Sequence, residues 1–399
     1  MVGRYGRIVT THERYRSLDV LRGIAILGTL GTNVWIFTSG SGIVGYLETV
    51  GSATGGWGIA ERVLQQLAQG KFLGLLTIMF GIGLAIQQRS AMRSDMRWPG
   101  RYPVRGALLF VDGVLHFVLF TEFDVLMGYA ITGVVVAYVL ATSERAQRRW
   151  MILAASVHVV LITAIAALIA TAPSHGRGEP LSPNPYSDGS FWDLVVFRLN
   201  NVLAFRAETI LILPMSIALF LLGARLFRMG VLGAEGAALR RRLVVIGISS
   251  FPVDFAFGMF GGGAGIMVSR YLLAPLVSLG ILAIVAQFYV RIPQAGFGGA
   301  RLSEIGRMAL SSYVLQNIVA SILCYGWGFG IAARLDTLAL TVLGTSAIYM
   351  ITVVCVSTFA HTWLQRFQRG PVEWLWNYSA GLSSPMKLSL ARPARSANE

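Results

Sequence analysis

The residues with the clearest capacity for acid–base chemistry are one histidine and two aspartates. Asp112 and His116 are four residues apart, so a helix would place them on one face, and Asp124 follows soon after. A neighbouring carboxylate orients an imidazole and stabilises its protonated form, as general-base catalysis requires. We therefore predict that His116 is a catalytic base oriented by Asp112 or Asp124. The alternatives are that Asp112 and His116 only hold helices together and that Asp124 only caps a helix.

Asn33 is a further polar residue inside an apolar segment. It lies fourteen residues after Asp19, or about 21 Å along a helix. His116 lies about 18 Å from the start of its own apolar segment. Because the two depths are similar, we expect Asn33 and His116 to meet in one cavity.

Other polar side chains inside apolar segments are candidates for substrate binding. Such side chains are costly in a membrane unless they face protein or water, so they mark functional positions or bridges between helices. Lys71 lies at the same end of the expected bundle as Glu122 and Asp124 and is placed to pair with either acid. The predicted substrate-binding residues are Asp19, Arg22, Lys71, Tyr129 and Gln316.

These residues lie in a chain of 399 residues that is 55% hydrophobic and only 13% charged. Soluble domains carry about 25% charged residues, so the composition excludes an ordinary cytosolic enzyme. Ten apolar segments approach the length of about 20 residues that a helix needs to cross a bilayer. We predict an all-α, polytopic membrane helix bundle with about ten transmembrane helices. The segments are 18–37, 72–87, 104–120, 125–140, 151–170, 210–227, 244–260, 271–289, 308–329 and 338–359.

The same pattern suggests how the chain is organised. Residues 1–376 are predicted to form a single membrane domain, and its two halves, 1–171 and 206–376, are joined by an outer loop over 172–205 that is rich in proline. Residues 377–399 have little apolar content and are predicted to be a disordered tail.

The positions of the basic residues predict the orientation. The formal net charge is +14, and 25 of the 33 Lys and Arg residues lie in segments on the side of the N-terminus, against seven in the opposite segments. Cytoplasmic loops retain Lys and Arg, so both termini are predicted to be cytoplasmic. The basic excess is thereby explained without a nucleic-acid partner.

Five arginines recur every four residues in one of the segments predicted to be cytoplasmic. Membrane topology alone explains them, but a basic loop also suits the phosphates of a cofactor or of anionic lipids. Under that second interpretation Arg89, Arg93 and Arg307 are the candidate cofactor-binding residues. The five are Arg89, Arg93, Arg97, Arg101 and Arg105.

Several familiar sites have no counterpart in the sequence. There is no Walker loop, no His-Glu-x-x-His and no Gly-x-Ser-x-Gly, which argues against an ATP-driven pump, a zinc protease and a serine hydrolase. Cys324 and Cys355 are isolated in apolar segments, so neither a disulfide framework nor a metal site is predicted.

Five stretches resemble the YeiB-like family of bacterial membrane proteins, which is classed as a domain of unknown function. The resemblance extends from residue 16 to residue 376 and implies a multi-pass protein of the bacterial cytoplasmic membrane. The stretches are 16–25 with Asn33; Lys71 and Phe72 with 79–85; 113–116 with 124–126, Tyr129 and Ala130; 306–313 with Gln316; and 369–376.

The opening stretch is also similar to that of heparan-alpha-glucosaminide N-acetyltransferase, and YeiB-like proteins are grouped with it among transmembrane acyltransferases. This resemblance implies transfer of an acyl group, with acetyl expected, from cytosolic acyl-CoA (acetyl-CoA) to a hydroxyl or amine acceptor at or across the membrane. It assigns Asn33 to the active site. That enzyme has its catalytic histidine in the loop after the asparagine, whereas residues 38–69 here contain none, so His116 would take the role. No metal is expected.

A proton-coupled transporter or exporter of a small molecule is the alternative function, in which the same buried Asp, His and Lys side chains carry protons. A non-catalytic membrane scaffold is a third. The expected partners are the lipid bilayer and a small-molecule or glycan acceptor, with a homodimer left open.

Overall fold

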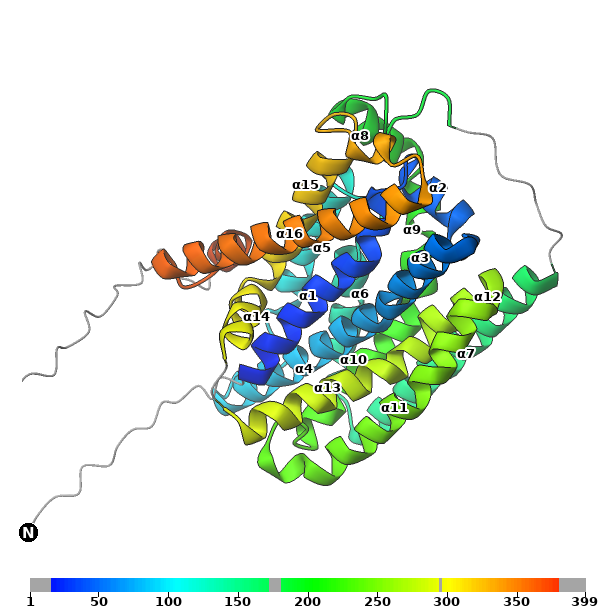
Figure 1. The fold of residues 1–399 in the computed structure, drawn as a ribbon. Helices are drawn as coiled ribbons and strands as arrows, with labels where there is room; N and C mark the ends of the chain where they lie inside the picture. The colour runs from blue at the N-terminus through cyan, green and yellow to red at the C-terminus, as the bar shows by residue number, and fades with distance from the viewer. Residues whose placement is uncertain (1–15, 172–180, 294–295, 380–399) are drawn as a thin grey trace, which may run out of the picture.

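The computed structural model describes residues 16–171, 181–293 and 296–379, and within these ranges every regular element is a helix (Figure 1). In the N-terminal part, two short helices connect the first two long ones, and the later helices follow one another through short turns. The bounds are α1 Arg16–Phe37, α2 Gly42–Thr49, α3 Gly55–Ala68, α4 Lys71–Arg93, α5 Tyr102–Leu119, α6 Leu126–Leu140 and α7 Glu144–Thr171.

The C-terminal part contains ten α-helices within the described ranges. They are α8 Phe191–Asn200, α9 Val202–Leu211, α10 Leu213–Arg228, α11 Ala237–Phe260, α12 Gly262–Val268, α13 Ala274–Arg291, α14 Phe297–Arg307, α15 Ala309–Cys324, α16 Leu338–Arg366 and α17 Pro371–Ser379. Three shorter elements connect some of them, namely the 3-10 helices η1 Ala234–Gly236 and η3 Ile331–Arg334 and the π-helix η2 Ser269–Leu273.

All ten predicted apolar segments correspond to helices. Among the described residues, seven helical stretches are long and apolar enough to cross a membrane. The bent pairs α9–α10 and α14–α15, with angles of 41° and 94°, raise the number to nine if each pair is one span. The remaining segment is α6, a shorter apolar helix of 15 residues. The prediction of an all-α, polytopic membrane bundle is therefore confirmed.

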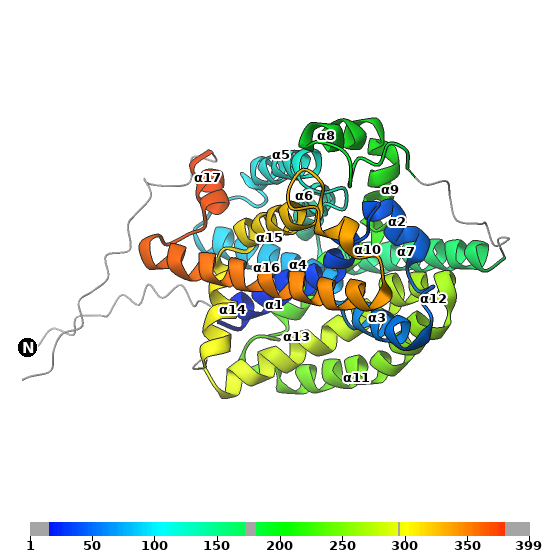
Figure 2. The same ribbon diagram turned by 45° about the horizontal axis from the view of Figure 1, so that its top comes forward.

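α1 and α4 lie in the middle of the bundle (Figure 2). Each belongs to a span that is 72% buried. Small residues allow the central helices to approach closely: a Cβ at Gly81 of α4 would overlap the backbone of Phe220 in α10, and one at Gly223 would overlap the backbone of Ile78. Close contact between small residues is a main source of helix association in membranes.

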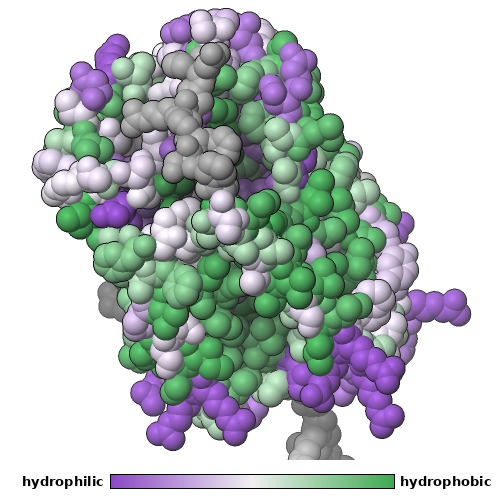
Figure 3. All heavy atoms as spheres, turned by 90° about the vertical axis from the view of Figure 1, so that its right-hand side faces the viewer, coloured by the Kyte–Doolittle hydropathy of each residue, from purple (hydrophilic) through white to green (hydrophobic). Residues whose placement is uncertain are grey.

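The peripheral helices expose apolar side chains outward. The spans that contain α5, α7, α11 and α16 are only 22% to 28% buried. Figure 3 shows hydrophobic side chains across the middle of one such face and hydrophilic ones at its lower end. A water-exposed apolar surface of this extent would be unfavourable, so this face is suited to contact lipid.

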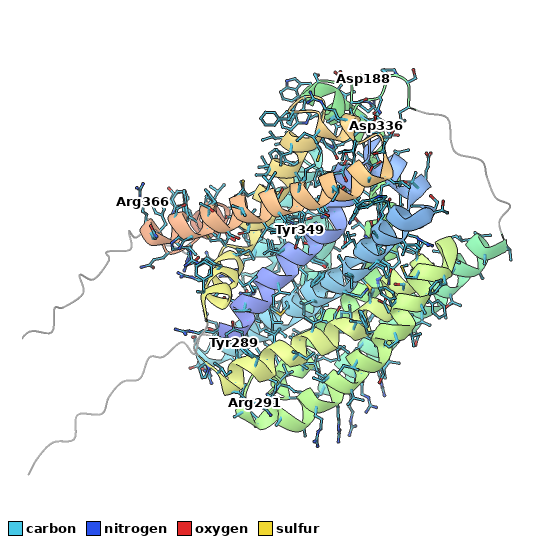
Figure 4. The ribbon with its side chains drawn as sticks, viewed as in Figure 1. Asp188, Tyr289, Arg291, Asp336, Tyr349 and Arg366 are labelled. Atoms are coloured by element: carbon cyan, nitrogen blue, oxygen red, sulfur yellow. The ribbon has the colours of Figure 1, made fainter. Side chains whose placement is uncertain are left out.

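The two ends of the bundle differ in charge. Figure 4 shows Asp188 and Asp336 near the end where α8 lies, whereas Arg291 and Arg366 lie towards the other end, where the first residues of α1 are also found. This arrangement agrees with the predicted orientation, in which the end carrying Arg16 is cytoplasmic.

The segment predicted as an outer loop contains α8 and the start of α9, while residues 172–180 lie outside the described ranges. The division into two halves at this segment stays a prediction. Of the tail predicted as disordered, residues 377–379 belong to α17 and residues 380–399 lie outside the described ranges.

Candidate functional site

His116 lies near the C-terminal end of α5 and is bonded through both ring nitrogens. Its Nδ1 is 2.9 Å from Oδ1 of Asp124 in the turn before α6, and its Nε2 is 3.1 Å from Nδ2 of Asn317 on α15. The residue is only 2% exposed. With the Asn317 amide donating to Nε2, a neutral imidazole donates its Nδ1 proton to Asp124. Three side chains from three parts of the chain thus form one buried hydrogen-bonded chain.

Asp124 is the carboxylate that orients the imidazole. Its second oxygen accepts the backbone amide of Met127 at 3.2 Å, so the same side chain also caps the start of α6. Gly113 allows the approach, because a Cβ there would crowd Met127 and the Asp124 carboxylate. Asp112 makes no hydrogen bond to His116, and its Oδ2 is buried with no partner among the described residues. The ring nitrogen points to the turn after α5 and not back along the helix.

Two arginines from the outer segment hold this turn in place. Arg198 of α8 binds Glu122 through Nε at 2.8 Å and donates to the carbonyl oxygen of Phe120 at 3.3 Å. Arg206 of α9 donates to the carbonyl oxygen of Asp124 at 3.0 Å. Neither arginine was predicted to belong to the site: Arg198 lies in the segment 172–205 that was predicted as a loop, and Arg206 directly follows it.

The prediction that Lys71 pairs with Glu122 or Asp124 is wrong. Its Nζ lies 2.6 Å from Oδ2 of Asp254 on α11, and the two side chains are 2% and 0% exposed. The first residue of α4 faces α11 and η2, whereas both acids of the turn are already bonded to other side chains.

The Lys71–Asp254 pair is completed by neutral hydrogen-bond partners. Ser269 of η2 donates to Oδ1 of Asp254 at 2.7 Å, and the side chain of Gln66 donates to Oδ2 at 3.2 Å. The backbone oxygen of Gln66 accepts from Lys71 at 2.6 Å. The charges of this pair are therefore compensated within the protein.

Two cavities lie beside α1 and share Val125 and Tyr313 in their walls. The larger, which we call the inner cavity, has a volume of about 380 Å³ and lies towards the N-terminal end of α1. Three guanidinium groups line it together with apolar side chains. The arginines are Arg22, Arg105 and Arg307, and the apolar residues include Ile26, Met79 and Phe80.

The smaller cavity, which we call the deep cavity, has a volume of about 40 Å³ and is lined by both polar and apolar residues. Asn33 lines it with Thr29 and Thr32, one and two turns along α1 from the inner cavity. Glu208 of α9 and Arg270 of η2 also line it and form an ion pair at 2.8 Å. Both charged residues were missed, since nothing in the sequence relates these two positions to α1.

His116 lines neither of these two cavities, so the prediction that it meets Asn33 in one cavity is wrong. The ring of Tyr313 lies between His116 and the cavities: the ring centroid is 5.0 Å from that of the imidazole, and Tyr313 lines both cavities. The position of Tyr313 on α15, a helix distant in sequence, explains why equal depth was not sufficient for contact.

The remaining predicted residues fall into different surroundings. Arg22 lines the inner cavity, and one of its nitrogens is 3.9 Å from the Asp19 carboxylate. Tyr129 is engaged in helix packing, because its hydroxyl is 2.6 Å from that of Thr77. Gln316 is completely buried, and both polar atoms of its side chain have no hydrogen-bond partner among the described residues.

The three predicted phosphate-binding arginines are not together. Arg307 lines the inner cavity, whereas Arg89 and Arg93 line a third cavity of about 590 Å³ between the ends of α4 and α10. Arg105 is the member of the periodic arginines that reaches the inner cavity, where it donates to Gln87 at 2.6 Å. The prolines between these arginines end the helical periodicity, so the five do not share a face.

Glu373 explains why the C-terminal stretch joins the bundle. From α17, its carboxylate accepts the amides of Leu310 and Ser311 at 2.8 and 3.2 Å and so caps α15. It also lines the inner cavity. Burial raises the pKa of this carboxyl, and the hydrogen bonds from Ser311 and Leu310 oppose that rise. The inner cavity therefore holds one acid among its arginines.

The chain is similar to a family of unknown function and to two bacterial proteins. Residues 226–382 match a family described as a protein of unknown function, DUF418. The chain is 26% identical over 409 residues to YxaH of Bacillus subtilis (strain 168), covering 94% of this chain and 96% of YxaH. It is also 26% identical over 400 residues to YeiB of Escherichia coli (strain K12), covering 91% and 95%. Both relatives are described as uncharacterized. The resemblance to the YeiB-like family is confirmed.

Proposed function

We propose that this YeiB-like, multi-pass membrane protein is an acyltransferase of the bacterial cytoplasmic membrane. It would move an acyl group, acetyl above all, from cytosolic acyl-CoA to a hydroxyl or amine acceptor at or across the membrane. One observation carries the proposal: the arginine-lined inner cavity and the deep cavity that Asn33 lines meet at a wall formed by Val125 and Tyr313. A donor entering from the predicted cytoplasmic end would direct its thioester towards that wall.

The inner cavity has the chemistry that an acyl-CoA donor requires. Guanidinium groups bind phosphate oxygens with strong, charge-assisted hydrogen bonds, and Arg22, Arg105 and Arg307 line one cavity. Apolar side chains such as Met79 and Phe80 would contact the pantetheine arm. The volume of about 380 Å³ is near the lower end of the range of roughly 300–1,000 Å³ typical of ligand sites. The cavity would therefore hold the pantetheine arm, and the nucleotide of acyl-CoA would remain at the opening.

The deep cavity would hold the reacting carbonyl. The amide of Asn33 lines it and would donate to the thioester oxygen as negative charge develops there. The acceptor oxygen or nitrogen forms a bond to the carbonyl carbon, and its proton passes to Nε2 of His116. The carbon–sulfur bond then breaks, and the imidazolium returns the proton to the departing thiolate. Asp124, 2.9 Å from Nδ1, would stabilise the imidazolium.

This sequence of steps requires Tyr313 and Asn317 to move aside, because Asn317 occupies Nε2 and the Tyr313 ring lies against the imidazole. Tyr313 thereby becomes a gate between donor and base. A gate of this kind would protect the thioester from water until the acceptor is bound.

The experiment measures binding and transfer separately with the purified full-length protein. Calorimetric titration with acetyl-CoA is expected to show at least about tenfold weaker binding for Arg105→Gln/Arg307→Gln, since each charged hydrogen bond contributes about 1.5–3 kcal/mol. Arg145→Gln/Arg149→Gln removes the same charge from the exposed start of α7 and is expected to bind as wild type does.

Transfer of a radiolabelled acetyl group to membrane extracts would then be compared with His116→Ala. The variant is expected to retain donor binding and to lose about 10²–10⁴-fold in rate, as removal of a general base does. Undiminished transfer by folded His116→Ala protein would contradict the assignment of the base. Absence of acetyl-CoA binding to monodisperse wild type would contradict the acyltransferase itself.

Proton-coupled transport is a second candidate, favoured by the buried Lys71–Asp254 pair beside a π-helix. Ionisable pairs inside membrane bundles frequently lie on proton pathways, and π-helices are common at functional sites. Proteoliposomes loaded with a pH-sensitive dye and exposed to small-molecule pools would test it. Solute-dependent proton entry that needs no acyl-CoA and disappears in Asp254→Asn would favour transport.

A further inference from the structure

We propose that the third cavity, between the ends of α4 and α10, is a binding site for a phosphate group at the predicted cytoplasmic face. The phosphate would belong to the headgroup of an anionic lipid or to a soluble phosphate compound. This site is separate from the inner cavity and does not depend on the acyltransferase proposal.

Three arginines from two helices line this cavity of about 590 Å³. Arg89 and Arg93 are four residues apart in the last turns of α4, so both project from one face of the helix. Arg228 is the last residue of α10 and approaches from the neighbouring helix. All three are exposed, and guanidinium groups that converge from two helices suit the several oxygens of a phosphate.

The positive charge of the lining is only partly compensated by acids. Glu235 is the one carboxylate that lines the cavity with these three arginines. Arg228 donates to the neutral side chain of Gln147 at 2.7 Å. Among the described residues, none of the three arginines lies within 4.0 Å of a carboxylate oxygen. An anion bound here would therefore meet net positive charge.

Hydrogen bonds from a buried arginine hold the floor of the cavity in place. The turn between α10 and η1 contains Gly230, whose φ of +77° is a conformation that favours glycine. Arg240 of α11, only 1% exposed, reaches under this turn and donates to the carbonyl oxygens of Val231, at 3.1 Å, and Gly233. A buried cation with obligatory partners keeps the turn in one conformation, so the cavity is formed before the ligand arrives.

Apolar side chains of the lining agree with a ligand at the membrane surface. Met92 is 65% exposed, and Phe227 and Leu232 also line the cavity. Basic pockets between transmembrane helices on the cytoplasmic side are suited to lipid headgroups. The same arginines would bind a soluble phosphate, and the choice of probe distinguishes the two sources.

The experiment compares two matched double variants of the detergent-purified, delipidated full-length protein. Arg89→Gln/Arg93→Gln removes the pair from the cavity. Arg145→Gln/Arg149→Gln removes an exposed pair with the same spacing on α7 that lines none of the three cavities. Each protein is titrated calorimetrically with dioctanoyl phosphatidylglycerol and, separately, with inorganic phosphate, and gel filtration checks that both variants remain monodisperse.

We expect binding of at least one probe, weakened about tenfold or more in Arg89→Gln/Arg93→Gln and unchanged in Arg145→Gln/Arg149→Gln. Binding of the lipid alone identifies a headgroup site, and binding of inorganic phosphate with equal affinity identifies a soluble phosphate. The proposal is overturned if neither probe binds wild type, or if the two double variants bind the probe with equal affinity.

Discussion

Removing one member of the Lys71–Asp254 pair should destabilise the protein more than any surface change. At 2.6 Å and an effective dielectric constant of about 20, the attraction is about 6 kcal/mol. Part of this lost attraction is offset when the side chain that remains after the substitution is neutralised or hydrated. Loss of one partner from a buried pair typically costs about 3–5 kcal/mol. We therefore expect Lys71→Met to lower the free energy of unfolding by about that amount.

The second substitution should restore much of the stability. Lys71→Met leaves a buried carboxylate, but Asp254→Asn in the same protein removes that charge and keeps an amide that can bond to Ser269 and Gln66. We expect the double variant to be more stable than Lys71→Met by about 2–3 kcal/mol. In a chain of this length, a loss of 4 kcal/mol corresponds to a decrease of about 5 °C in melting temperature.

The assay is thermal unfolding in one detergent, followed by intrinsic tryptophan fluorescence, for wild type, both single variants and the double variant. The coupling between the two sites is the test, because it isolates the pair from the effect of each substitution alone. Additive decreases in melting temperature, with no recovery in the double variant, would refute the reasoning. The buried pair would then contribute no specific interaction.

Three further outcomes are expected. Asp124→Asn should reduce acetyl transfer strongly while Asp112→Asn leaves it near wild type, because of these two carboxylates only Asp124 bonds to the imidazole; equal losses in a radiolabel assay would contradict this. Burial raises the pKa of Glu373, so this carboxylate becomes neutral at a higher pH than an exposed one. Titrations with acetyl-CoA should therefore show affinity that increases as pH falls, and Glu373→Gln should flatten that dependence relative to wild type; parallel profiles would argue against it. Gly81→Leu should destabilise the α4–α10 contact by about 1–3 kcal/mol through overlap with Phe220, and an unchanged melting temperature would show that the helices can separate freely.

Much of the fold follows from the sequence because hydropathy is a local property. A helix satisfies its own backbone hydrogen bonds, so an apolar segment of sufficient length identifies a membrane helix without knowledge of its neighbours. Each of the ten predicted segments corresponds to a helix or a bent helix pair for this reason. The excess of basic residues on one side likewise predicts the orientation, since it depends only on where Lys and Arg lie between the apolar segments.

The candidate site was predictable only in part. The spacing of Asp112, His116 and Asp124 identified the imidazole and two candidate carboxylates to orient it. The choice between the carboxylates depended on the direction of the Nδ1 atom, which the turn between α5 and α6 determines. Asn317, the third member of the hydrogen-bonded chain, comes from α15 and has no relation to His116 in the sequence.

Only the tertiary structure decided which charges meet. Lys71 pairs with Asp254 because the start of α4 packs near α11 and η2, and Arg89 is separated from Arg307 because α4 and α14 end at different cavities. Local patterns determine which helices form and which side chains they carry. Which helices pack against each other depends on the close fit of their surfaces, for example at Gly81 and Gly223. That fit is a property of the whole bundle.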